Sequence, residues 1–434
     1  MTAILRHRFA PLAAVLAALL ALYGIAYVTE PAPAGRAAAK PERVGVESAT
    51  AVCPGVKGAD VAVYLPGTMS RETMKDAEPY TVTGPGGLEA GFVTRALSGA
   101  RRGLAGVRCA EPAAETWLVG PGPANAEVTL HLTNAAKTPA MADVQVWAAE
   151  GLVSGEAGLG LEVAPGKSRK IDLRDLAPSA DVMAVSVTSL VGRVAVAASA
   201  APETGGADWL PAAAAPATKI VVPGIPGGGG RRELLVAAPG EADATVHITA
   251  VTEGSRYAMK GRESVDVPAG GVLAIDVTTG IGGESAGLVL DSTAPVVAGV
   301  VITGTGGRQD VAYTAGTPPL DLGSAVAANG TGSRLLLTAP GAAGRVRVQI
   351  VPARGEPGSP AEVEVPAGRT TSVPLKAKGA FGVVVTPVSG QVYGGRVIEE
   401  RQRAGLLLTA QPLAQARTWT MLPPLADTPL AVLP

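Results

Sequence analysis

The chain has 434 residues, of which 47% are hydrophobic and only 3% aromatic, and its formal net charge is −1. This length is enough for roughly three domains of ~100–200 residues each. The near-zero charge gives no indication of nucleic-acid binding. Glycine (56 residues) and proline (36) are abundant, but much of both falls at fixed places between apolar runs. That placement indicates turns joining short strands rather than a disordered chain.

The first segment predicts a membrane span. Residues 9–28 carry no charged side chain, and about twenty helical residues rising ~1.5 Å each cross a ~30 Å hydrocarbon core. Arg6 and Arg8 before the span and Glu30 after it favour a cytoplasmic N-terminus and an extracytoplasmic body. We therefore expect a signal anchor in the cell membrane. The alternative is a cleaved signal peptide and a secreted body, because "APA" at Ala32–Ala34 resembles a small-residue cleavage site.

Two cysteines follow the span. Residues 29–50 have no hydrophobic period and several Pro and Ala residues, which predicts an extended linker. Cys53 and Cys109 lie in the next segment, and in an oxidising compartment they are expected to form one disulfide. A metal site is the alternative, although neither cysteine has a His or a second Cys at ligand spacing.

From Trp117 the sequence repeats at intervals of about one hundred residues, a period typical of tandem domains. Each copy opens with a short apolar strand, a Pro-Gly turn and a longer alternating strand; the copies read "WLVGPGPANAEVTLHLT", "RRELLVAAPGEADATVHITAV" and "SRLLLTAPGAAGRVRVQIV". A second block follows in each copy, "LEVAPGKSRKIDL", "VDVPAGGVLAIDV" and "VEVPAGRTTSVPL". Proline presets φ and glycine tolerates a positive φ, so these blocks predict hairpins. A third block of two apolar strands closes each copy.

About six strands per copy, joined by tight turns, predict antiparallel sheets. No stretch after the anchor shows a sustained period of 3.6 residues, so the body is expected to be all-β. The fold we predict is tandem immunoglobulin-like antiparallel β-sandwich repeats behind one transmembrane helix; the alternative is a β-propeller-like ring. The predicted segments are 1–8 (cytoplasmic), 9–28 (signal anchor), 29–50 (linker), 51–116 (disulfide-bearing β segment), 117–203, 204–303 and 304–398 (three β repeats) and 399–434 (capping tail).

Candidate chemistry is sparse. His131 and His247 fall at one position of successive copies, where the third copy has Gln349, which disfavours a catalytic histidine. The glycine cluster "GIPGGGGRR" beginning at Gly224 lacks Gly-Lys-Ser/Thr and precedes a strand, so it does not indicate a nucleotide site. Carboxylates are scattered; Asp172 and Asp175 lie near each other in "IDLRDL", and Asp276 lies in the matching strand of the next copy. We predict no catalytic, cofactor-binding or metal-ligating residue.

A family resemblance adds to this interpretation. An uncharged anchor, "CPG" at Cys53–Gly55 and repeats of "LLL-x-APG…V-x-VPAG" resemble an actinobacterial family of membrane-anchored envelope proteins of unknown function. The Ala/Gly/Val/Arg bias, typical of a GC-rich genome, agrees with that source. The resemblance spans most of the chain from Cys53, and relatives are often encoded near cell-wall glycosyltransferases. It implies location and class, and it transfers no catalytic residue.

The function expected is that of a non-catalytic extracytoplasmic scaffold or binding module of the cell envelope. Its loops would contact an envelope protein or a cell-wall glycan, and no nucleic acid. One alternative is an accessory carbohydrate-active enzyme that uses carboxylates on the strands. The other is a surface adhesin.

Overall fold

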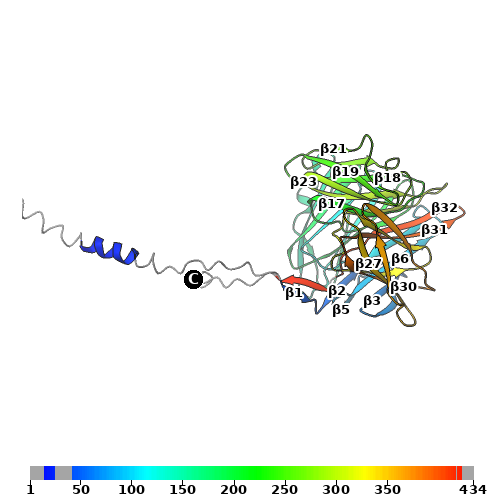
Figure 1. Ribbon diagram of the computed structural model, residues 1–434, viewed down its shortest axis with the longest axis horizontal. Helices are drawn as coiled ribbons and strands as arrows, with labels where there is room; N and C mark the ends of the chain where they lie inside the picture. The colour runs from blue at the N-terminus through cyan, green and yellow to red at the C-terminus, as the bar shows by residue number, and fades with distance from the viewer. Residues whose placement is uncertain (1–13, 25–41, 417, 423–434) are drawn as a thin grey trace, which may run out of the picture. The chain divides into compact units, whose positions relative to one another are not determined.

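The computed structural model describes residues 14–24, 42–416 and 418–422 (Figure 1). It divides into two parts, residues 45–419 and a second part made of the two chain ends. In the second part, β1 (Glu42–Gly45) and β33 (Trp419–Leu422) form a two-stranded sheet. Of the predicted span at 9–28, residues 14–24 are helical, and the rest lies outside the described residues. Within the described ranges, none of the helices is both long and apolar enough to cross a membrane.

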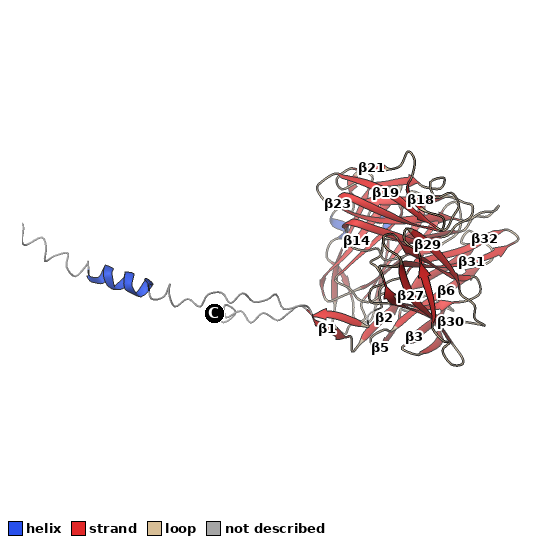
Figure 2. Cartoon of the chain, in the orientation of Figure 1, coloured by secondary structure: helices blue, strands red, loops and turns tan. Residues whose placement is uncertain are grey.

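The body, residues 45–419, is built almost wholly of antiparallel strands, which confirms the predicted all-β class (Figure 2). Its strands form four groups, which we call the N unit, repeat 1, repeat 2 and repeat 3. In the N unit a four-stranded sheet of order β4-β3-β6-β7 accompanies the pair β2-β5. The N unit comprises β2 (Ala49–Cys53), β3 (Asp60–Leu65), β4 (Thr68–Thr73), β5 (Tyr80–Gly84), β6 (Glu89–Ala96) and β7 (Gly103–Arg108).

The disulfide predicted between Cys53 and Cys109 is present in the N unit. Both cysteines are buried, and they pack in one apolar core with Phe92 and with Trp209 of repeat 1. The disulfide therefore links the end of β2 to the residue that follows β7, close to the contact between the N unit and repeat 1.

Repeat 1 consists of two facing sheets, one of order β11-β10-β14-β8 with β12 also on β10, the other of order β13-β9-β15-β16. Buried Val, Leu and Ala side chains from both sheets form the core between them. Its elements are β8 (Glu115–Pro121), β9 (Ala126–Thr133), β10 (Ala140–Ala148), β11 (Gly151–Leu152), η1 (Glu156–Gly158), β12 (Leu161–Val163), β13 (Ser168–Asp172), η2 (Leu173–Asp175), β14 (Val182–Val191), β15 (Ala195–Pro202) and β16 (Asp208–Leu210).

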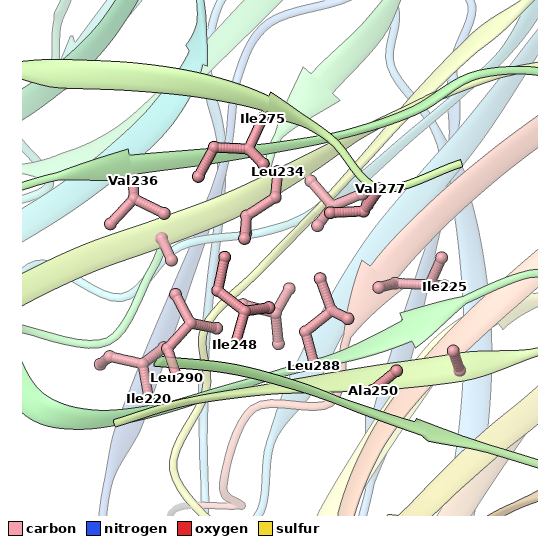
Figure 3. Close-up of a cluster of buried hydrophobic side chains, with 14 of the residues drawn as sticks. Ile220, Ile225, Leu234, Val236, Ile248, Ala250, Ile275, Val277, Leu288 and Leu290 are labelled. Atoms are coloured by element: carbon pink, nitrogen blue, oxygen red, sulfur yellow. The ribbon is translucent and has the colours of Figure 1, made fainter. Parts of the chain in front are cut away.

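Repeats 2 and 3 have matching topologies. Repeat 3 has sheets of order β25-β30-β27-β28 and β29-β26-β31-β32. Repeat 2 has the matching orders β17-β23-β19-β21 and β22-β18-β23-β24, with β23 in both. Figure 3 shows the core of repeat 2, where Leu234, Val236 and Ile275 of one sheet face Ile248, Leu288 and Leu290 of the other.

Repeat 2 comprises β17 (Ala217–Ile225), β18 (Arg232–Ala237), β19 (Ala244–Thr252), β20 (Arg256–Ala258), β21 (Ser264–Val267), β22 (Val272–Asp276), β23 (Ala286–Thr303) and β24 (Val311–Ala315). Repeat 3 comprises β25 (Ser324–Asn329), β26 (Ser333–Ala339), β27 (Gly344–Pro352), β28 (Ala361–Val365), β29 (Arg369–Pro374), β30 (Phe381–Ser389), β31 (Tyr393–Gln402) and β32 (Gly405–Pro412).

The long strand β23 corresponds to two separate strands in each of the other repeats. Its first half pairs with β17 and β19 in one sheet, and its second half pairs with β18 and β24 in the other. In repeats 1 and 3 a glycine with positive φ, Gly192 (φ 70°) or Gly390 (φ 69°), separates the two strands. The equivalent stretch of repeat 2, "STAP" from Ser292, contains no glycine, so the chain continues as one strand.

The topology corrects one prediction about the repeats. By pairing pattern, β9 of repeat 1 corresponds to β18 and β26, and β10 corresponds to β19 and β27. The repeats predicted from the sequence align β8 with β18, which begins the first copy one strand too early. His131 on β9 and His247 on β19 therefore occupy different positions of the fold, and the strand register places Arg347, not Gln349, at the position of His247.

The four units contact one another in a closed ring. Apolar clusters join the N unit to repeat 1 (through Trp209), repeat 1 to repeat 2 (Trp117 with Leu235), repeat 2 to repeat 3 (Val289 with Tyr393) and repeat 3 to the N unit. The units are thus sandwiches, as predicted, and their contacts close into a ring. The last strand of each unit, β7, β16, β24 or β32, lies at an edge of its sheet and faces the centre of this ring.

Candidate functional site

The carboxylates that the sequence singled out do not form a site. Asp172 caps the short turn η2 by accepting the N–H of Arg174, and Asp175 lies exposed in the same turn. Asp276, in repeat 2, accepts the N–H of Thr278, and hydrogen bonds from Thr278 lower the pKa of its carboxyl. These side chains stabilise turns at the surface of two different repeats.

The two histidines of the body also lie apart. His131 is buried and packs against Trp209, with ring centroids 5.4 Å apart. Burial, with a smaller contribution from Lys170, lowers the pKa of His131 to about 4, so the imidazole is neutral at physiological pH. His247 is exposed on β19. The tryptophans Trp117 and Trp147 are buried at the contact between repeats 1 and 2, with centroids 5.1 Å apart.

The centre of the ring holds a buried polar cluster that the sequence did not reveal. The carboxylate of Asp310, immediately before β24, accepts the N–H groups of Leu104 in β7 (3.0 Å), Leu408 in β32 (2.8 Å) and Val311 (2.9 Å). One side chain of repeat 2 therefore binds the N unit and repeat 3. Burial raises the pKa of Asp310 to about 7, although these donors and Arg102 oppose the shift. Gly103 permits the approach, since a Cβ there would lie 2.0 Å from Oδ1 of Asp310.

Asp208 has the same role at the start of β16. Its Oδ1 accepts the N–H of Gly106 in β7 at 2.7 Å and the N–H of Trp209 at 2.8 Å, which binds repeat 1 to the N unit. Burial raises the pKa of Asp208 well above its usual range. Close by, Arg396 is fully buried and donates to Gln411, and its Nε and Nη1 have no hydrogen-bond partner among the described residues. Burial lowers the pKa of Arg396 to about 10.

The loops that precede the four central strands meet on one side of the ring. We call them the inner hairpins; they span residues 96–103, 202–208, 303–311 and 402–405. Arg102, 3% exposed, donates to the carbonyls of Arg308 and Gly405, each at 3.0 Å, and thereby joins three hairpins. The N–H of Gly206 donates to the carbonyl of Ala100 at 3.1 Å and joins the fourth. The hairpins thus form one hydrogen-bonded surface.

Three clefts open beside the inner hairpins, at equivalent contacts between neighbouring units. The 1–2 cleft has a volume of about 540 Å³, the 2–3 cleft about 770 Å³ and the 3–N cleft about 210 Å³. In the 1–2 and 2–3 clefts, the preceding repeat contributes three segments to the walls. They are the loop after its first strand (β8 or β17), the loop before its long outer strand (β14 or β23) and its inner hairpin. Ligand sites in proteins commonly measure ~300–1,000 Å³, so the 2–3 cleft is large enough for an oligomeric ligand.

The 2–3 cleft has walls with few side chains and a charged rim. Glycines from the loops at 227–229, 283 and 306–307 form much of its surface. The β31–β32 hairpin adds Arg401 and Arg403, and Arg334 and Glu399, on neighbouring strands of repeat 3, form an ion pair of 2.8 Å in the lining. Glu284 accepts the N–H of Gly254 at 2.7 Å and so fixes a further loop.

Arg232 fixes the glycine-rich wall of the 2–3 cleft. This arginine is 3% exposed and donates to the carbonyls of Pro226 (3.1 and 3.2 Å), Gly229 (3.2 Å) and Thr303 (3.1 Å), among others. The glycines of "GIPGGGGRR" therefore wrap around a guanidinium of the same chain. The loop has a defined shape because its carbonyl oxygens converge on one buried cation.

A family model described as "Family of unknown function (DUF5719)" matches residues 68–376, from β4 of the N unit to the end of repeat 3's β29 region. The chain belongs to this family. That match confirms the expectation of a family of unknown function. The match spans parts of all four units rather than a single repeat.

Comparisons with curated proteins and with solved structures identify no relative that bears on function. No curated protein matches the chain. Among solved structures, it aligns with an α-L-rhamnosidase of Streptomyces avermitilis complexed with L-rhamnose, at 10% identity and a TM-score of 0.13. The alignment covers 91% of this chain and 56% of the rhamnosidase chain, so the protein spans little more than half the length of that enzyme. At this level of likeness the rhamnosidase carries no argument about fold or activity.

Proposed function

We propose that the protein is a non-catalytic binding module of the bacterial cell envelope. It is an envelope protein of actinobacterial type, anchored in the membrane by residues 9–28, with its ring outside the cytoplasm. Its loops bind an envelope protein or a cell-wall glycan. The observation that carries the proposal is the open 2–3 cleft of about 770 Å³ on a hydrogen-bonded ring.

Rigidity supports a role in recognition. Arg102, Asp310 and Arg232 hold the inner hairpins and the cleft wall through hydrogen bonds to backbone groups. A preorganised surface binds with a smaller loss of conformational entropy than a mobile one. The disulfide between Cys53 and Cys109 supports export, because such bonds persist mainly in oxidising compartments.

The position of the carboxylates favours binding over catalysis. Asp208 and Asp310 do converge, but both are fully buried and accept backbone N–H groups. A glycosidase acid or nucleophile must reach its substrate, with two carboxylates facing the scissile bond. These two aspartates instead join the units of the ring.

A retention assay tests the proposal. The full chain, purified in a mild detergent, is applied to isolated cell-wall glycan and, separately, to solubilised membrane proteins of an actinobacterium. Saturable retention on the glycan, or capture of one defined membrane protein, is the expected result. A chain that passes through both without retention overturns the proposal. Hydrolysis of the glycan during incubation would favour the enzyme alternative instead.

A further inference from the structure

The 2–3 cleft differs in charge from the equivalent 1–2 cleft. In the 1–2 cleft, Arg231 is ion-paired with Glu233 and lies 3.9 Å from Asp276, and Asp181 and Glu203 add negative charge. In the 2–3 cleft the position of Glu233 is taken by Arg334, since each is the second residue of its strand, β18 or β26. Because the two clefts share their geometry, the fold itself does not require arginines in one of them.

Two guanidinium groups of the 2–3 cleft are free to bind a ligand. The side chains of Arg401 and Arg403 are exposed and make no hydrogen bond or ion pair with any residue in the described part of the chain. Their backbone is nevertheless fixed, because the N–H of Arg308 donates to Ala404 (3.2 Å) and the N–H of Leu406 donates to Thr305 (3.0 Å). The β31–β32 hairpin therefore carries Arg401 and Arg403 on a backbone that hydrogen bonds hold in place.

The other lining residues narrow the class of ligand. The cleft contains no aromatic side chain in its described lining, so a neutral sugar would find no ring to stack on. Leu406 is its only lining side chain that is both apolar and larger than alanine, so a peptide would find no pockets for its side chains. Hydroxyl-bearing Ser285 and Thr305, the amide of Gln402 and backbone groups of glycines suit a hydroxylated chain.

We propose that the 2–3 cleft binds an anionic glycan, whose carboxylate or phosphate groups contact Arg401 and Arg403. Guanidinium groups bind both kinds of oxyanion through paired N–H···O bonds. Sugar hydroxyls occupy the polar walls, and the carboxylates of Glu253 and Glu284 accept hydrogen bonds from hydroxyl groups at the rim. This inference rests on the proposed function and names the ligand class of the same site.

The test measures binding of the full chain to three soluble ligands: an oligogalacturonate, a glycerol-phosphate oligomer and a neutral dextran oligomer. The double variant Arg401→Gln/Arg403→Gln is compared with the matched double variant Arg345→Gln/Arg354→Gln. The latter removes two exposed arginines from repeat 3 that do not line the cleft. Circular dichroism and thermal melting establish that both variants remain folded.

We expect the wild type and the control to bind at least one anionic oligomer and not dextran, with affinity that falls as salt rises. The cleft variant should bind about tenfold more weakly, since two exposed charge-assisted contacts are lost. Preference for the uronate or for the phosphate oligomer identifies the source of the oxyanion. Equal binding by both double variants, tight binding of dextran, or binding of poly-glutamate with no anionic glycan overturns the inference.

The two proposals fail in different ways. If the full chain is retained on cell-wall glycan or captures a membrane protein, yet neither anionic oligomer binds, the proposed function stands and the ligand class is wrong. If nothing is retained and no oligomer binds, both are wrong.

Discussion

Replacing Asp310 by alanine tests whether the centre of the ring depends on this carboxylate. The substitution leaves three buried N–H groups, those of Leu104, Leu408 and Val311, without their acceptor. An unsatisfied buried donor costs about 1–3 kcal/mol, so for three donors we expect a loss of roughly 3–9 kcal/mol in the free energy of unfolding. Native domains are stable by only about 5–15 kcal/mol, so the loss is a large fraction of the total.

The loss should depend on pH, because burial in the folded protein raises the pKa of Asp310 from its ordinary value of 3.8 to about 7. A group whose pKa is raised by folding contributes stability below its unfolded pKa, and this contribution is lost as pH rises toward the folded pKa. Between pH 4 and pH 6 the wild type therefore loses about 2 kcal/mol that the variant cannot lose. The destabilisation by Asp310→Ala should be largest near pH 4.

Urea unfolding followed by tryptophan fluorescence measures both effects, since Trp117, Trp147 and Trp209 are buried at contacts between units. Asp175→Ala is the control; it removes an exposed aspartate and should change stability by less than about 0.5 kcal/mol. A destabilisation by Asp310→Ala below about 1 kcal/mol at pH 4 would refute the reasoning. So would a value that does not change between pH 4 and pH 6.

Three further predictions concern other parts of the ring. Burial lowers the pKa of His131 from 6.5 to about 4, so this histidine destabilises the folded state as pH falls through that range. His131→Phe should therefore remove up to about 3 kcal/mol of the difference in unfolding free energy between pH 7 and pH 4.5, measured by urea titration. Arg232→Met should speed amide hydrogen exchange in the loop at 226–230 while leaving exchange in the N unit unchanged. Cys53→Ser with Cys109→Ser should lower stability by about 2–4 kcal/mol, measured against the oxidised wild type; an unchanged melting temperature contradicts this.

Local features of the fold were predictable because turns depend on a few consecutive residues, here mainly Pro and Gly. Turns between β12 and β13, β21 and β22, and β28 and β29 fall on the three Pro-Gly and Pro-Ala-Gly blocks, but the hairpins predicted there were wrong, because each turn joins strands of two different sheets. The same chemistry explains the mistaken strand match in repeat 1. Pro121 ends β8 and Gly122 follows it, and the two resemble the Ala-Pro-Gly turn that follows β18. A Pro-Gly turn marks a reversal of the chain, but it does not say which two strands it joins or whether they lie in one sheet.

The central cluster could not be predicted in the same way. Asp310 accepts hydrogen bonds from residues 206 positions earlier and 98 positions later, and no local pattern marks such contacts. One signal was available: in two repeats an aspartate follows a glycine-rich hairpin, as "GGAD" at Gly205 and "GGRQD" at Gly306. Without the strand topology, neither stretch differs from an ordinary surface turn.

Closure of the ring explains why its centre is polar. The strands β7, β16, β24 and β32 are edges of their sheets, so each has backbone groups without a neighbouring strand. Apolar side chains at the centre would bury the N–H groups of Leu104, Gly106 and Leu408 without acceptors. Asp208 and Asp310 supply those acceptors. The buried carboxylates are therefore required by the architecture, and ligand specificity is left to the clefts, where Glu233 in one repeat corresponds to Arg334 in the next.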